Sequence, residues 1–130
     1  MMADTQTTIQ GVRVLVCAPD GEKIASERAA LDLVGEALQE GIEWALIPVE
    51  RLAEEFFQLK TGLAGQIVQK FVQYRRRLII LGDISGFVAE SRAFRDFVYE
   101  SNRGTEFWFL ADLPEVNERL KRWQQQQSAE

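Results

Sequence analysis

The sequence contains no histidine and only one cysteine, Cys17. Histidine is the side chain most often used for proton transfer near neutral pH and the commonest metal ligand, so its absence excludes His-dependent catalytic triads and zinc sites. A lone cysteine cannot form an intrachain disulfide, and the apolar surroundings of Cys17 predict a buried strand thiol rather than a nucleophile. We expect a chain without a metal or another cofactor.

Long hydrophobic runs are also missing. No apolar stretch approaches the roughly 20 residues that a membrane-spanning helix needs, and residues 1–10 lack the apolar core of a signal peptide. The 15 Lys and Arg residues against 20 Asp and Glu residues leave a formal net charge of -5. This charge repels the phosphates of nucleic acids and of anionic lipids. We therefore expect a cytoplasmic protein that binds neither nucleic acid nor membranes.

The remaining composition is that of an ordinary globular protein. Of the 130 residues, 46% are hydrophobic and 27% are charged, with 3 Pro and 9 Gly, which is typical of a single folded domain. No linker or internal repeat divides the chain. We expect one domain over residues 1–130, with frayed ends at residues 1–10 and 124–130.

Four short apolar runs rich in β-branched and aromatic residues predict strands at residues 12–17, 44–47, 78–81 and 107–110. Between and after them, apolar residues recur at helical spacing. The predicted helices run from Ser26 to Gly41, from 49 to 57, from 62 to about 74, from the loop 82–86 to about Gly104, and from Asp112 to Trp123. Helical connections between strands require parallel pairing, so the sequence predicts an α/β fold with a mostly parallel, four- or five-stranded sheet covered by helices.

The most informative segment for function is residues 59–65, in which Thr61 precedes Gly62 and Gly65 at a predicted helix start. A glycine in a helix interior costs roughly 1 kcal/mol relative to alanine, so two glycines in one turn suggest that something approaches the backbone closely. That neighbour is either a strand or helix of the same chain, or an anion or partner protein attracted by Lys60 and the helix N-terminus. The spacing differs from that of a phosphate-binding loop and does not support nucleotide hydrolysis.

A second group of candidates follows the predicted strands, at the edge where α/β proteins collect ligands. Asp20, Asp83 and Asp112 each follow a strand, and Ser85 lies in the glycine-rich loop 82–86. Asp20 suits a turn and Asp112 a helix cap, which leaves Asp83 as the acid without an obvious structural role. Ser85 lacks both the Gly-x-Ser-x-Gly spacing and a histidine partner, so the loop does not match a hydrolase nucleophile.

Residues 56–71, 77–83 and 100–104 resemble a bacterial family catalogued as domain of unknown function 4180, and the resemblance covers the chain from about Val12 to Leu120. The resemblance implies membership of this family but no particular activity. Residues 57–63 are also similar to the loop-helix segment of STAS domains of the anti-sigma-factor antagonist type, in which a phosphorylatable Ser or Thr precedes a Gly-Leu pair. That resemblance implies a STAS-like fold with Thr61 as the phosphoacceptor, although Leu59 stands where those domains carry an acidic residue.

These observations predict a non-enzymatic module that binds a protein partner and acts as a regulatory switch centred on Thr61. The alternative is a small-molecule or anion-binding protein, or a weak hydrolase, that uses the strand-end loops. A partner module is expected to expose Phe56, Phe57 or Phe87 on a flat patch, whereas an enzyme has a deep pocket with converging polar groups. The candidate binding residues are Lys60, Thr61, Gly62, Gly65, Asp83 and Ser85.

Overall fold

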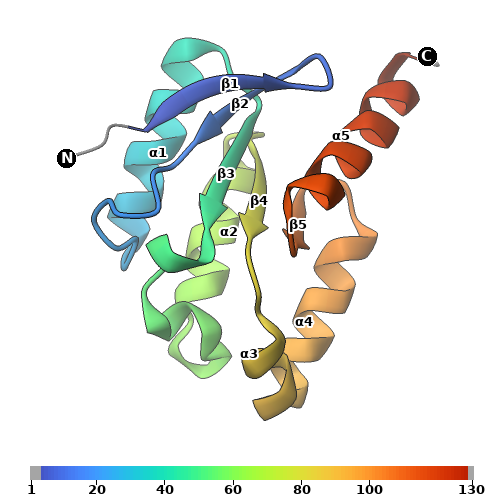
Figure 1. Cartoon of the computed structure of the whole chain (residues 1–130). Coiled ribbons are helices and arrows are strands. Elements are labelled where there is room, and N and C mark those ends of the chain that lie inside the picture. Colours follow the sequence, from blue (N-terminus) through green and yellow to red (C-terminus); the bar gives the residue numbers. More distant parts are fainter. Residues whose placement is uncertain (1–3, 129–130) are drawn as a thin grey trace.

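Five strands form one sheet in the computed structural model, which describes residues 4–128 (Figure 1). In chain order they are β1 (Thr5–Ile9), β2 (Val12–Val16), β3 (Trp44–Pro48), β4 (Arg77–Leu81) and β5 (Phe107–Leu110). The strands lie side by side in that same order, with β1 antiparallel to β2 and the other pairs parallel. The four predicted strands and the mostly parallel sheet are confirmed.

Helices connect the parallel strands. They are α1 (Glu27–Glu40) between β2 and β3, α2 (Leu63–Gln73) between β3 and β4, α3 (Ser85–Glu90) and α4 (Arg92–Arg103) between β4 and β5, and α5 (Leu113–Ser128) after β5. Parallel crossovers are right-handed, and the chain steps across the sheet in one direction, so α1, α2 and α4 share one face. Figure 1 follows this winding from the blue hairpin of β1 and β2 to the red helix α5.

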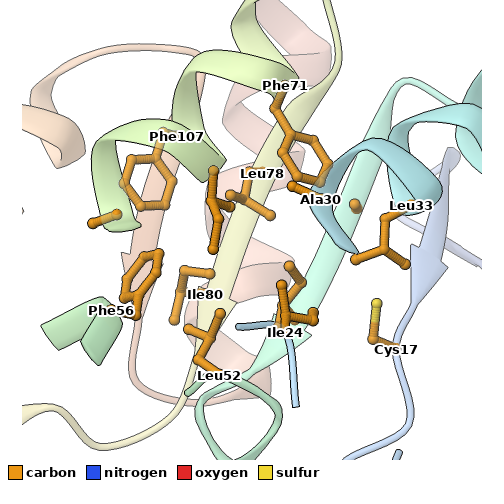
Figure 2. Close-up of a cluster of buried hydrophobic side chains, with 14 of the residues drawn as sticks. Cys17, Ile24, Ala30, Leu33, Leu52, Phe56, Phe71, Leu78, Ile80 and Phe107 are labelled. Carbon is orange, nitrogen blue, oxygen red and sulfur yellow. The ribbon is translucent and has the colours of Figure 1, made fainter. Parts of the chain in front are cut away.

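The face beneath α1, α2 and α4 buries the larger of two cores. Alternate side chains of each parallel strand point into it, because successive residues of a strand face opposite sides of the sheet. Figure 2 shows Leu78 and Ile80 of β4 gathered with Phe71 of α2 and Ala30 of α1. Phe71 ends the ridge of buried residues spaced by four along α2, as the sequence predicts.

Helix α5 covers the opposite face, over a second core built around three tryptophans. The ring centroids of Trp44 in β3 and Trp108 in β5 lie 4.6 Å apart, and Trp123 of α5 meets Trp44 edge-on at 5.4 Å. Val116 and Leu120 complete the buried stripe of α5. The sequence spacing of these α5 residues is therefore confirmed as a core-facing stripe.

The start of the chain belongs to the sheet, because residues 5–9, within the segment expected to be frayed, form the strand β1 that the sequence did not predict. Gln10 and Gly11 both have positive φ, and this geometry forms the two-residue turn that suits a β-hairpin. Asp4 anchors the beginning of β1, because its carboxylate pairs with Arg51 at 2.9 Å and accepts the Ala18 backbone N–H at 2.9 Å. Residues 1–3 lie outside the described range.

At the other end, α5 continues through Ser128, beyond the predicted helix end at Trp123 and into the segment expected to be frayed. Residues 129 and 130 lie outside the described range. The predicted helix after the loop 82–86 is divided into α3 and α4. The division falls at Ser91, whose hydroxyl accepts the Phe94 backbone N–H at 3.1 Å and starts a new helix.

The predicted helix over residues 49–57 is replaced by two short 3-10 helices, η1 (Val49–Arg51) and η2 (Glu54–Phe57). The backbone of Ile24 accepts a hydrogen bond from the Ala53 N–H at 3.2 Å and donates one to the Arg51 carbonyl at 2.8 Å. These contacts hold Leu52 in an extended conformation, which an α-helix cannot include. Leu52 and Phe56 are nevertheless both buried.

Candidate functional site

Thr61 ends a third 3-10 helix, η3 (Leu59–Thr61), immediately before α2. Its Oγ1 lies 2.8 Å from the Glu55 carbonyl oxygen and 2.9 Å from that of Gln58, so the hydroxyl donates to this pair. The same oxygen accepts the Leu63 backbone N–H at 3.3 Å. Thr61 therefore links η2 to the first turn of α2, and Gly62 occupies the N-cap position of α2.

The two glycines after Thr61 are bare. A Cβ built on Gly62 or Gly65 meets no atom within 4 Å, and both residues are exposed. The interpretation that a strand or helix of the same chain packs against them is therefore wrong. Gly62 has a φ of +81°, which favours glycine, whereas Gly65 lies in α2 without such a constraint. We refer to residues 60–65 as the 60–65 turn.

A cavity opens beside the 60–65 turn, between η2 and η3 on one side and α3 and α4 on the other. Its volume is about 340 Å³, at the lower end of the range for cavities that hold organic ligands. Phe57 and Phe87 line it and stack with ring centroids 4.1 Å apart, which joins η2 to α3. Its polar lining combines Lys60 with Glu54 and Glu90.

An apolar stripe extends the 60–65 turn along α2. Val68 and Val72 follow Gly65 by three and seven residues, the spacing that places side chains on one face of a helix. Val72 is 40% exposed, and both valines line a second cavity of about 360 Å³ that Phe97 of α4 borders. The sequence interpretation missed this stripe, although the helical spacing from Gly65 could have indicated it.

Asp83 lies in the loop after β4, and Ser85 is the first residue of α3. Neither residue lines the cavity beside Lys60. Asp83 Oδ1 accepts the Ser85 backbone N–H at 2.9 Å at the start of α3. Hydrogen bonds from the backbone and side chain of Ser85 lower the pKa of Asp83, which makes this carboxylate a weaker base. Asp83 is thus suited to shaping the loop before α3 rather than to activating Ser85.

The other strand-end acids have structural roles that the sequence predicts. Asp112 Oδ1 accepts the Glu115 backbone N–H at 3.0 Å at the start of α5, and Asp20 lies in a turn closed by a hydrogen bond from the Gly21 N–H to the Ala18 carbonyl at 3.3 Å. Within residues 4–128, no three or more Cys, Asp or Glu side chains gather closely enough to hold a metal ion.

The expectation that Phe56 and Phe57 are exposed on a partner-binding patch is wrong. Phe56 is fully buried and Phe57 is 5% exposed, because both rings pack into the core beside Phe94 of α4. Phe87 is half-buried by its stack on Phe57.

Cys17 is buried, as its sequence surroundings predict. It follows β2, its backbone N–H donates to the Leu46 carbonyl at 2.9 Å, and its side chain is inaccessible to solvent. Burial, with a smaller contribution from Asp4, raises the pKa of the thiol to about 12. The thiol therefore stays protonated near neutral pH and is a poor nucleophile.

One of three comparisons with known proteins gives a match, and it agrees with the family that the sequence resembles. No curated protein and no solved structure matches the chain. Among the helices of the described residues, none is both long and apolar enough to cross a membrane. A family model matches residues 9–120, which includes every strand from β2 to β5 and the 60–65 turn. The chain belongs to the family described as domain of unknown function DUF4180.

Proposed function

We propose that the protein is a regulatory module that binds a protein partner through the 60–65 turn and the adjoining stripe of α2. The observation that carries this proposal is the bare surface at Gly65, which has open space where a Cβ would stand. Alanine would make the helix more stable at this position. Neither packing nor a positive φ accounts for this glycine, and unlike the equally bare Gly35 it lies in the first turn of its helix near the exposed Lys60, so we assign it to the close approach of a partner.

The chemistry of the 60–65 turn indicates what the partner presents to it. Within residues 4–128, the backbone N–H groups of Ala64 and Gly65 have no hydrogen-bond acceptor. These groups carry the positive end of the α2 dipole, and the exposed Lys60 adds a positive charge. A partner segment with a carboxylate or carbonyl oxygen at this turn, followed by apolar side chains against Val68 and Val72, complements both features.

Thr61 supplies the regulatory step in this proposal. Phosphorylation would remove the hydroxyl proton of Thr61, and with it the hydrogen bond to the backbone carbonyls of Glu55 and Gln58. It would also place about two negative charges at the start of α2. The link between η2 and α2 would be lost, while the sheet and both cores keep their contacts. The similarity of residues 57–63 to the phosphoacceptor segment of STAS domains supports this role. A cytoplasmic location suits the free, buried Cys17.

Site-specific photo-crosslinking in the native host tests the proposal. A photoreactive amino acid at Gln66, which is exposed next to Gly65, is expected to capture a defined protein. The same amino acid at Gln125, exposed on α5, is the matched control and is expected not to capture it. Equal capture from both positions, or capture from Gln125 alone, would contradict a contact surface at the 60–65 turn.

A further inference from the structure

A cavity of about 180 Å³ lies on the other side of the sheet from the 60–65 turn, where the end of α4 meets β5 and α5. Three arginines line it: Arg103 at the end of α4, and Arg119 and Arg122 on α5. No Asp or Glu residue lines it, although acidic residues outnumber basic ones in the whole chain by 20 to 15. We call this space the arginine cavity.

The charges of the arginine cavity are largely uncompensated. Within residues 4–128, Arg119 and Arg122 have no carboxylate oxygen within 4.0 Å. Arg103 pairs with Glu100 at 3.7 Å, but both side chains are about two-thirds exposed, and such pairs contribute little. Burial and the nearby Arg122 lower the pKa of Arg119, as expected for a guanidinium that lacks a counter-ion.

Arg119 is held in place before any ligand arrives. Its guanidinium carbon lies 4.3 Å from the ring centroid of Trp108, and Trp108 Nε1 donates to the Gly104 carbonyl at 2.8 Å. Arg119 Nη2 donates to the Asn102 carbonyl, which satisfies the C-terminal end of α4. The guanidinium has further N–H groups beyond this bond. A fixed donor loses less conformational entropy on binding than a free side chain does.

We propose that the arginine cavity binds the phosphate group of a small phosphorylated molecule or free inorganic phosphate. Arginine forks match the oxygens of a phosphate group, and the cavity also offers the Thr105 hydroxyl and the Gln126 amide as neutral donors. Its volume is below the roughly 300 Å³ of cavities that enclose whole organic ligands, so the phosphate enters and the remainder of an ester stays outside. This site is independent of the proposed partner surface.

The test is a titration of the full chain with inorganic phosphate and, separately, with glycerol 3-phosphate, at constant ionic strength. Trp108 and Trp123 line the cavity, so tryptophan fluorescence reports occupancy directly. Saturable binding of either probe supports the proposal. Tighter binding of inorganic phosphate would indicate the free ion as the ligand, and tighter binding of glycerol 3-phosphate would indicate a phosphate ester. Failure of both probes to saturate at cellular phosphate concentrations would overturn it.

Arg122→Gln is the decisive variant because Arg122, unlike Arg119, makes no side-chain hydrogen bond or ion pair within the described residues, so we expect its loss to leave the fold intact. We expect Arg122→Gln to weaken phosphate binding about tenfold with an unchanged melting temperature. Lys121→Gln is the matched control, since it removes the same charge from α5 outside the cavity, and its affinity should stay within about twofold of wild type. Undiminished binding by Arg122→Gln, or an equal loss in both variants, would overturn the proposal.

Discussion

Gly65→Ala is expected to make the protein more stable. The new Cβ enters open space, and the position is an ordinary helical one, so the change acts through helix propensity alone. The expected gain in the free energy of unfolding is about 0.5–1 kcal/mol. An unfolding entropy of roughly 2.1 cal/mol/K per residue over this chain converts that gain into a rise of about 2–4 °C in Tm.

Differential scanning calorimetry with two companion variants gives the comparison. Gly35→Ala in α1 is the matched control, because Gly35 is also exposed, helical and free of neighbours within 4 Å of its Cβ position, and its Tm should rise by a similar amount. Gly62→Ala should lower Tm, since a left-handed residue with a Cβ costs about 1–2 kcal/mol. A fall in Tm for Gly65→Ala beside a rise for Gly35→Ala would refute the reasoning, because it would mean that the space at Gly65 is filled.

Three further variants test the fold and the site. Thr61→Val should lower the free energy of unfolding by about 1 kcal/mol in urea titrations, because it removes the hydroxyl that donates a hydrogen bond to the backbone carbonyls of Glu55 and Gln58. An effect no larger than that of Thr61→Ser would contradict this role of the hydroxyl. Trp123→Ala should cost about 3–5 kcal/mol by exposing the core beneath α5, whereas a loss no greater than that of Gln125→Ala would show that α5 does not hold this core. The Cys17 thiol ionises in the unfolded chain before it does in the folded protein, where its pKa is raised to about 12. Stability should therefore fall as pH rises from about 9 towards 12, by up to about 1.4 kcal/mol per pH unit. Cys17→Ala has no thiol to ionise, so this part of the stability loss should be absent from the variant, and the difference in urea midpoint between wild type and variant should change steadily above about pH 9. A difference that stays constant with pH would contradict a raised pKa for the Cys17 thiol.

The parallel strands could be predicted from the sequence because a strand buried on both faces is a continuous apolar run. The edge strand β1 could not, since its residues are mostly polar and exposed and its pairing depends on the turn at Gln10 and Gly11. The η1 and η2 segments were mistaken for one helix because the contact between Ile24 and Leu52 that breaks it joins residues far apart in sequence.

The candidate site was found in part for similar reasons. Two glycines after Thr61 are visible in the sequence, but whether a neighbouring element fills the space beside them is a property of the packed structure. Asp83 and Ser85 were chosen because they follow a predicted strand, yet neither residue lines the cavity beside Lys60. The arginine cavity has no local sequence signal, because Arg103 and Arg119 come together only when α5 crosses the end of α4.

The most direct test of the proposed function is the affinity of the partner captured from Gln66, measured with purified proteins by isothermal titration calorimetry. If the partner lies against the bare turn, Gly65→Ala should weaken binding at least about tenfold, because a methyl group then occupies the contact. Gly35→Ala, with the same expected gain in stability, should bind as tightly as wild type. Equal affinities for wild type and Gly65→Ala would contradict the claim that the 60–65 turn is the partner surface.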